Sequence, residues 1–174
     1  MRIQCFFVSC YLLLSVPGTY AQETNTVIYK DTVFIAAILQ QQNTYRTALR
    51  LPPLVWSSAL ATDALAWARH LAEVDKGTHD LSVRGKEGEN LWWGSAGKFT
   101  YTEMVSYWGN EQQFFQYGTF PDCQTSKSAV VGHYTQMIWR NTTSVGCALA
   151  GNGKTDYLVC RYSPPGNIIG QKPY

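Results

Sequence analysis

The chain has 174 residues, enough for one domain with a small appendage. Its formal net charge is only +2 at pH 7, so we expect neither nucleic-acid binding nor electrostatic attachment to a membrane surface. Aromatic residues make up 14% of the chain and lie in clusters, which predicts a large aromatic core.

The N-terminus has the pattern of a cleaved export signal. The basic residue Arg2 precedes an apolar run over residues 5–16, and the small residue Ala21 follows at a suitable cleavage position. The apolar run is too short for a comfortable transmembrane span. We therefore expect residues 1–21 to be a signal peptide and residues 22–34 a polar lead-in. The mature protein is expected to be secreted, or periplasmic in a bacterium.

The cysteines fit an oxidising compartment. Export removes Cys5 and Cys10 and leaves Cys123, Cys147 and Cys160, so one disulfide and one remaining thiol are expected. Cys147 and Cys160 lie on neighbouring strand-like runs, and we predict that they form the disulfide. Cys123 lies in a loop and is predicted to be an exposed free thiol.

Two amphipathic helices are predicted in the first half of the chain. The first begins at Asp31 or Thr32 and ends before residues 51–53, because a proline disfavours helix for the residue ahead of it. The second is capped by Ser57 or Ser58. The predicted inner faces are Ile35, Ile38, Leu39, Gln42, Tyr45 and Leu49 in the first helix, and Leu60, Ala64, Trp67, Ala68 and Leu71 in the second.

A third helix carries an unusual carboxylate. It is predicted to begin at Thr100 or Thr102 and to continue to about Tyr117. Glu111 falls near the middle of its apolar side, where a carboxylate must be protonated, paired or bound to a cation, unless it lies at a wet pocket mouth. The apolar side consists of Met104, Val105, Trp108 and Phe115.

Strands are predicted around these helices. Residues 54–56 form a short extended piece, and residues 89–93 form a half-buried strand or pocket wall after a polar loop. Residues 143–150 and 156–162 flank the sequence Gly151-Asn152-Gly153-Lys154, which is typical of a hairpin.

Residues 132–139 form the most informative stretch. Tyr134, Met137 and Ile138 have the spacing of one face of a short helix. His133 then falls in the first turn, where free backbone N–H groups favour the neutral imidazole that binds metals. Taken by itself, such a histidine is more often a packing residue.

Four polar residues stand out along the chain: His79, Glu89, Glu111 and His133. Their spacing matches no local ligand motif. If they converge, two imidazoles and two carboxylates suit a divalent ion, zinc or copper above all, in an open and weakly held site. The same group could activate water in a hydrolase, or form a purely structural network.

Four motifs, in the same order, resemble the CAP superfamily, which comprises the cysteine-rich secretory, antigen 5 and pathogenesis-related class 1 proteins. Residues 132–139 and 157–167 resemble its two signatures, and residues 88–91 and 108–111 resemble its weaker motifs. The resemblance implies an α+β fold over residues 35–174. This fold is a three-layer α-β-α sandwich with a small antiparallel sheet between helices.

The resemblance also implies a site. His79, Glu89, Glu111 and His133 are expected to meet in one cleft, where relatives hold zinc through the two histidines. We therefore expect a weak, open Zn²⁺ site at His79 and His133, no other cofactor and no catalytic residue.

Relatives are secreted, are tied to defence, fertilisation, venom and host interaction, and in several cases bind sterols or fatty acids. The resemblance thus implies a secreted, non-catalytic monomer that binds a lipid or sterol, with an unidentified host or cell-surface partner. One alternative is a metal-assisted hydrolase or protease with Glu89 or Glu111 as general base. Another is a precursor that releases a C-terminal peptide, Pro164 to Tyr174, as some plant members do.

The chain departs from the family pattern at three places. Val131 stands where relatives have a cysteine, so Cys123 lacks its expected partner. The usual Cys-Asn-Tyr has Arg161 in place of asparagine, and Gln42 stands where many relatives have histidine. We find no cysteine-rich C-terminal extension and expect no ion-channel blocking.

Overall fold

The computed structural model describes residues 26–174, so the predicted signal peptide lies outside the described residues. The helices are α1 Thr32–Ala48, α2 Ser58–Val74, α3 Tyr101–Gly109 and α4 Gly132–Met137, with 3₁₀ turns η1 Leu81–Val83 and η2 Asn110–Phe114. The strands are β1 Val27–Ile28, β2 Val55–Trp56, β3 Gly88–Ser95, β4 Ser144–Gly151 and β5 Thr155–Ser163. Within residues 26–174, no helix combines the length and apolar character that a membrane crossing requires.

The sheet is built around the predicted hairpin of β4 and β5. These two strands pair antiparallel, β3 adds antiparallel to the other side of β5, and β1 adds antiparallel to β4. The predicted antiparallel sheet is confirmed for these strands, and the two-residue strand β2 adds to β4 in the parallel direction. The polar lead-in, for which no strand was predicted, contains β1.

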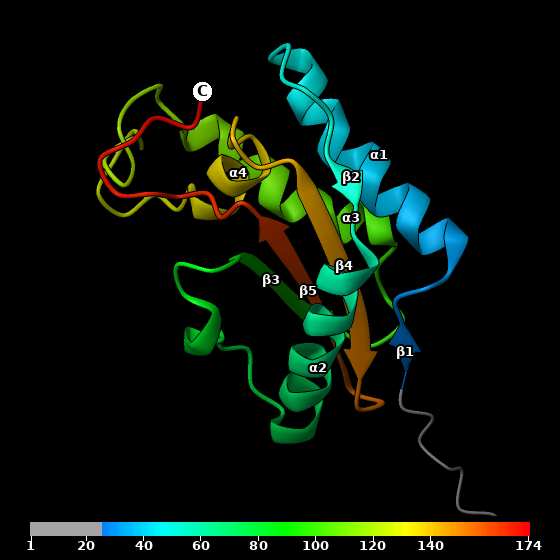
Figure 1. Cartoon of the computed structure of the whole chain (residues 1–174). Coiled ribbons are helices and arrows are strands. Elements are labelled where there is room, and N and C mark those ends of the chain that lie inside the picture. Colours follow the sequence, from blue (N-terminus) through cyan, green and yellow to red (C-terminus); the bar gives the residue numbers. More distant parts are fainter. Residues whose placement is uncertain (1–25) are drawn as a thin grey trace, which may run out of the picture.

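Side-chain alternation along the long strands separates two cores, as expected for strands covered on both faces. Leu91, Ala148 and Val159 face α2 and pack against its alanine and leucine side chains. Trp92, Cys147 and Cys160, each one residue away from these in sequence, lie in the larger core with α1, α3 and α4. Figure 1 shows these layers, and the predicted α-β-α sandwich is confirmed.

A glycine allows α2 to approach the sheet closely. Gly146 lies on β4, and a Cβ atom there would lie 2.2 Å from the backbone nitrogen of Ala61 and 2.4 Å from the carbonyl oxygen of Ser57. Since real Cβ contacts are essentially never this short, only glycine permits the observed packing of α2 on β4.

The first helix begins with Asp31 as its N-cap, as predicted, and the side chain accepts a hydrogen bond from Phe34 N. Its inner face was predicted only in part. Ile38 and Gln42 are buried as expected, but Phe34 and Arg46 are also fully buried. The prediction missed Arg46 because a charged side chain is rarely buried without partners, and its partners lie far away in sequence.

The third helix is shorter than predicted. Thr100 caps it with a complete capping box that includes Glu103, but the α-helix ends at Gly109 and continues only as the 3₁₀ turn η2. Gly109 is a poor helix former, and a Cβ atom there would overlap the Tyr45 ring. Glu111 therefore lies on η2 and not on an α-helix that continues to Tyr117.

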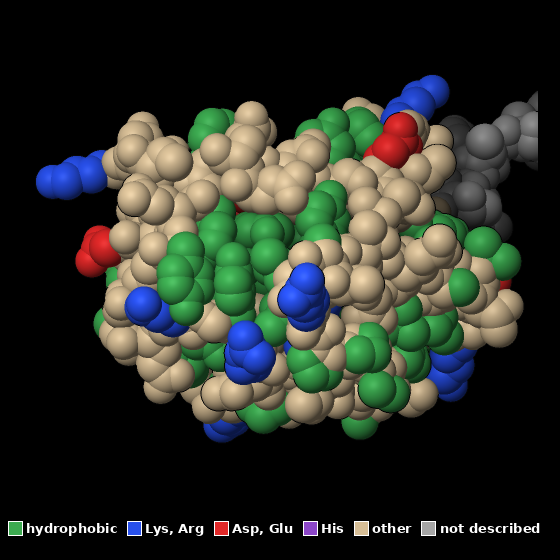
Figure 2. All heavy atoms as spheres, turned by 90° about the horizontal axis from the view of Figure 1, so that it is seen from above, with side chains coloured by type: hydrophobic (Ala, Val, Ile, Leu, Met, Phe, Trp, Pro, Cys, Tyr) green, Lys and Arg blue, Asp and Glu red, His purple; other side chains and the backbone are tan. Residues whose placement is uncertain are grey.

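The C-terminal end of the chain packs onto the loop after η2. The Tyr174 ring lies 6.3 Å from the Phe115 ring and 5.0 Å from the Tyr117 ring, and Lys172 Nζ lies 4.7 Å above Tyr117. Figure 2 views the molecule from above, over the end that carries the C-terminus in Figure 1, and shows hydrophobic side chains gathered there among lysines and arginines.

The predicted disulfide is confirmed, but the predicted exposure of Cys123 is wrong. Cys147 and Cys160 form a disulfide and lie directly opposite each other in the β4–β5 register. Cys123 is free, as predicted, but it is buried and not exposed. The loop folds back so that Gln116 N donates to Cys123 O. Burial raises the pKa of the Cys123 thiol, which disfavours the reactive thiolate.

Candidate functional site

His79 and Glu89, two of the four predicted site residues, form a pair. His79 lies in the loop after α2, and Glu89 lies near the start of β3. His79 Nδ1 and Glu89 Oε1 are 2.6 Å apart, and the same oxygen accepts a hydrogen bond from Asp80 N at 3.1 Å. Glu89 thus fixes both the imidazole and the backbone of its loop, while the His79 side chain remains 57% exposed.

A buried arginine supports this pair from the neighbouring strand. Arg161 lies opposite Glu89 in the β3–β5 register. Its Nη2 is 2.9 Å from Asp80 Oδ2 and 3.1 Å from Glu89 Oε2, and its Nη1 is 3.8 Å from Glu87 Oε2. Arg161 is therefore a cation among three carboxylates, at the position where the family pattern has asparagine.

The pKa values of two carboxyl groups around Arg161 shift in opposite directions. Burial opposes ionisation of Asp80, but hydrogen bonds from Ser82 and from Arg161 outweigh it, so the pKa of Asp80 lies below its usual value. Burial raises the pKa of Glu87, and the partial compensation by Arg161 does not reverse this shift. Only one sequence feature pointed to this cluster, the departure from the family pattern at Arg161.

The second pair joins Glu111 on η2 to His133 in the first turn of α4. Glu111 Oε1 lies 2.6 Å from His133 Nδ1, and Oε2 accepts hydrogen bonds from the backbone N of His133 at 2.9 Å and of Tyr134 at 3.0 Å. Glu111 thus caps α4, where free N–H groups and the helix dipole favour a carboxylate. Of the three states predicted for a carboxylate on an apolar side, Glu111 is paired.

Arg46 of α1 holds the other end of α4. Its guanidinium donates to the carbonyl oxygens of Met137 and Trp139 at 2.9 and 2.8 Å, and to those of Pro52 and Thr142 at 2.7 and 3.0 Å. The bond to Met137 O satisfies a carbonyl group that the end of α4 leaves free, and the other bonds tie α1 to the neighbouring turns. Burial lowers the pKa of Arg46 to about 10, which leaves it charged at neutral pH.

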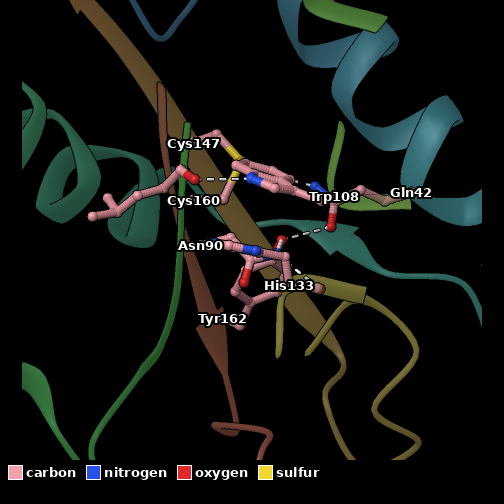
Figure 3. The surroundings of a disulfide bond; sticks show 8 residues. Gln42, Asn90, Trp108, His133, Cys147, Cys160 and Tyr162 are labelled. Carbon is pink, nitrogen blue, oxygen red and sulfur yellow. Dashed lines mark hydrogen bonds between the residues drawn. A yellow bond between two sulfur atoms is a disulfide. The ribbon is translucent and has the colours of Figure 1, made fainter. Parts of the chain in front are cut away.

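A buried polar chain connects His133 to the disulfide (Figure 3). Asn90 Nδ2 donates to the carbonyl oxygen of His133 at 3.0 Å and to the Tyr162 hydroxyl at 3.2 Å. The Tyr162 hydroxyl donates to Gln42 Oε1 at 3.0 Å, and Gln42 Nε2 lies 4.0 Å from Cys160 Sγ. The indole of Trp108 stacks on His133, with ring centroids 6.1 Å apart. His133 is thereby fixed through both its backbone and its ring.

The two histidine–glutamate pairs line two different cavities. His79 and Glu89 border a cavity of about 740 Å³ between the 79–89 loop and the C-terminal segment. Glu111 and His133 border a cavity of about 390 Å³, together with aromatic side chains of β3 and α3. No cluster of three or more histidine, cysteine, aspartate or glutamate side chains suited to a metal ion occurs within residues 26–174. The convergence of all four residues in one cleft stays a prediction.

A third cavity is markedly apolar, and its described lining contains none of the four histidine and glutamate side chains. Its volume is about 520 Å³, and it lies where α1, β1 and the start of α3 meet the sheet. Sequence reasoning did not find it, because its walls come from segments that only the fold brings together. Its lining includes Val33, Ala37, Phe99, Met104, Leu149 and Asp156.

The C-terminal segment that the sequence marks as a possible released peptide is tied into the domain. Gly166 N donates to Gln136 Oε1, and Asn167 Nδ2 donates to Gly132 O in the first turn of α4. Farther on, Pro173 O accepts a hydrogen bond from Arg140 N. These bonds give the segment a structural role in holding α4, and the release of a peptide stays a prediction.

The fold and the motifs agree with what comparisons with known proteins show. Residues 39–162 match the cysteine-rich secretory protein family, CAP. Pathogenesis-related protein 1C of Nicotiana tabacum is 39% identical over 138 residues, covering 78% of each chain. Pathogenesis-related protein PR-1 of Medicago truncatula is 34% identical over 181 residues, covering 100% of each chain.

A solved structure supports the fold. The crystal structure of NaASP2 with Zn²⁺ superimposes with a TM-score of 0.69, covering 83% of this chain and 86% of that chain at 21% identity. The sequence match extends over more than half of the chain, and the plant relatives exceed 30% identity across most of it. The chain therefore belongs to the cysteine-rich secretory protein (CAP) family and, within it, to the pathogenesis-related, defence-type class.

Proposed function

We propose that this protein binds an apolar lipid, of the sterol or fatty-acid type, in the 520 Å³ cavity between α1 and α3. The observation that carries the proposal is the composition of the wall. Its lining includes Val33 and Ala37 of α1 and Met104 of α3, and Phe99 and Leu149 add to the apolar surface. Cavities of this size and composition are typical of small-molecule sites.

The cavity is accessible to a ligand. Val33 in its wall is 69% exposed, so the cavity opens to solvent and an apolar molecule can enter it from outside. Ala37 contributes to this, because a small side chain on α1 leaves the space that a larger residue would fill.

The test is to fill the cavity. We expect Ala37→Trp to weaken binding of a fluorescent fatty acid or sterol by at least about tenfold, since the indole would occupy the ligand's volume. The control is Ala59→Trp, at an exposed position on α2. Equal binding by both variants, measured by fluorescence titration, would remove the cavity from the proposal.

A second candidate function, binding of a divalent metal, is supported by the two histidine–carboxylate pairs. In each pair the carboxylate holds Nδ1 at 2.6 Å, which orients the imidazole and leaves Nε2 to bind an ion. We propose that His79 and His133 together hold zinc weakly, as its two protein ligands. Bound zinc would supply Lewis acidity there. NaASP2, a structural relative, has been crystallised with Zn²⁺.

Calorimetry separates this candidate from a structural network. We expect a one-site Zn²⁺ isotherm for the protein, lost in both His79→Ala and His133→Ala and kept in His70→Ala, an exposed histidine on α2. Loss in only one of the first two variants would show that the two histidines do not share an ion.

We also propose that the protein is secreted, on the pattern of its N-terminus. The expected product begins at Gln22, after cleavage at Ala21. N-terminal sequencing of protein recovered from the medium of expressing eukaryotic cells checks this. Retention of the full chain inside the cells would contradict it.

A further inference from the structure

One asparagine has the sequence context of a glycan acceptor. Asn141-Thr142-Thr143 has the pattern of asparagine, any residue except proline, then threonine or serine, which marks N-linked glycosylation sites in secreted proteins. It is the only such triplet in the 174-residue sequence. Because such triplets also arise by chance, the pattern needs the structural context that this modification requires, an exposed turn or loop.

The structure provides that context. Asn141 lies in the connection between α4 and β4, at the end of the molecule that carries the C-terminus (Figure 1). Thr142 N donates to Trp139 O at 3.1 Å, which closes a β-turn with Arg140 and Asn141 in its two central positions. Both central residues are exposed, so a bulky and hydrophilic glycan on Asn141 would extend into water.

The next residue in the triplet anchors the turn from inside. Thr142 is fully buried, its hydroxyl donates to Pro164 O at 2.9 Å, and its carbonyl oxygen accepts from Arg46 Nη2 at 3.0 Å. Thr143, the third residue of the triplet, is exposed like Asn141. The conformation of the turn is therefore held by Thr142, and attachment of a glycan to Asn141 displaces none of these buried contacts.

The site is separate from the proposed ligand sites. Asn141 is not among the described residues that line the apolar cavity or the two cavities of the histidine–glutamate pairs. It lies instead beside the C-terminal segment, since Arg140 N donates to Pro173 O at 2.7 Å. A glycan on Asn141 is thus compatible with both ligand-binding proposals.

We propose that Asn141 carries an N-linked glycan when the protein is secreted from a eukaryotic cell. The donor is an oligosaccharide linked to a polyprenyl diphosphate, which the export pathway of the cell supplies. Asn141 Nδ2 forms a bond to C1 of the first sugar, the bond from C1 to the diphosphate oxygen breaks, the diphosphate leaves with the bonding electrons, and Nδ2 loses one proton. This inference rests on the proposed secretion and adds a modification site to it.

Secreted protein tests the assignment directly. The full chain is expressed in cultured mammalian cells, recovered from the medium and treated with a peptide-N-glycosidase in heavy-oxygen water. The enzyme removes the glycan and turns the asparagine that carried it into an isotope-labelled aspartate. We expect treatment to increase the mobility of the protein on a denaturing gel, and peptide mass spectrometry to find the label at position 141.

Three variants at exposed positions test the triplet. We expect Asn141→Gln and Thr143→Ala to lose both the mobility change and the label, because each breaks the acceptor pattern at a different residue. Thr143→Ser is the matched control and should retain both, since serine also completes the pattern. Circular dichroism and thermal denaturation of the three secreted variants check that the fold persists.

The outcomes separate this inference from the proposed secretion. Wild-type protein in the medium with an unmodified Asn141 peptide, or a mobility change that survives in Asn141→Gln, would overturn the glycan site while leaving secretion intact. Retention of the full chain inside the cells, with its N-terminal segment uncleaved, would overturn secretion and this inference with it.

Discussion

At the scale of single residues, two buried arginines have different roles. Arg46 donates to four backbone carbonyl oxygens of three segments, and so connects α1 to the end of α4 and to the turn before β4. Arg161 instead neutralises carboxylates around the His79 loop. Removing the first would leave several buried acceptors unsatisfied, and removing the second would leave buried like charges together.

The first prediction concerns Arg46. Replacement by methionine keeps much of the volume but removes all four donors, and we expect the free energy of unfolding to fall by about 3 kcal/mol or more. Urea denaturation followed by tryptophan fluorescence measures it. Arg69→Met, at an exposed position on α2, should change the free energy by less than about 0.5 kcal/mol. A similarly small effect at Arg46 would contradict the role assigned to it.

The second prediction concerns alkaline pH. Burial, together with the neighbouring Asp75, raises the pKa of Tyr157 from 10.0 to about 12. Because the folded state keeps the proton that the unfolded chain loses, stability is fully present below pH 10 and is lost as the pH rises through about 12. Tyr157→Phe should lessen this loss without abolishing it, since burial also raises the pKa of Tyr134 to about 12.

Brief urea denaturation experiments between pH 9 and 12 measure the free energy of unfolding of wild type and Tyr157→Phe, over a range set by the two pKa values above. Tyr107→Phe, at an exposed position, serves as the matched control and should leave the alkaline profile of wild type unchanged. If Tyr157→Phe and wild type lose the same stability over that range, the buried hydroxyl is not the titrating group.

At this scale, motifs identified some site residues and missed others. His79, Glu89, Glu111 and His133 could be singled out because their side chains are chemically informative and belong to family motifs. The roles of Arg46 and Arg161 depend on partners far away in sequence. A single sequence does not show which carbonyl or carboxylate will lie beside a charged residue.

At the scale of elements, α4 depends on charged groups at both of its ends. It has only six residues, and a helix this short is not stable in isolation. Glu111 caps its N-terminal N–H groups, and Arg46 binds its C-terminal carbonyl groups. The side chain of His133 is thus positioned by residues of η2 and α1 and not by the intrinsic preference of its own segment.

The third prediction tests the N-terminal cap. Glu111→Gln keeps the shape but weakens the hydrogen bonds to α4, and we expect unfolding to become easier by about 1 kcal/mol. Glu73→Gln, on the exposed side of α2, should be close to neutral. Thermal denaturation at the same salt concentration compares the two variants. Equal melting temperatures would show that the carboxylate contributes nothing to α4.

The fourth prediction tests the close approach of α2 to the sheet. Gly146→Ala forces a Cβ atom into the backbone of α2 and should destabilise the protein by about 1–3 kcal/mol. Gly118→Ala adds a Cβ atom whose nearest neighbour is 3.6 Å away, an ordinary contact, and should be tolerated. Chemical denaturation of both variants gives the difference. A tolerated Gly146→Ala would mean that the layers separate easily.

The elements themselves were largely predictable. Helix starts at Asp31, Ser57 and Thr100 follow from capping chemistry, and the β4–β5 hairpin follows from its turn sequence. The end of α3 at Gly109 and the parallel pairing of β2 depend on tertiary packing and could not be read from local sequence. Periodicity predicts that an element exists better than where it ends.

At the scale of the whole molecule, the two faces of the sheet have different surroundings. The α2 side is packed with small and aliphatic residues, and the Arg161 cluster lies on this face beside Glu89. The other side contains the disulfide, the buried polar chain to His133 and the apolar cavity beside α1 and α3. The family fold was predictable from its motifs, but the cavity depends on which small side chains this chain places on α1.

The central claim is that a lipid occupies the cavity between α1 and α3. Photo-crosslinking with an octadecanol that carries a diazirine on its chain tests it most directly, with unlabelled octadecanol as competitor and peptide mass spectrometry to locate the label. We predict competable labelling on peptides that contain Val33 to Ala37 and Phe99 to Met104. Labelling confined to the aromatic surface around Tyr117 and Tyr174, or labelling that the competitor does not reduce, would contradict the account.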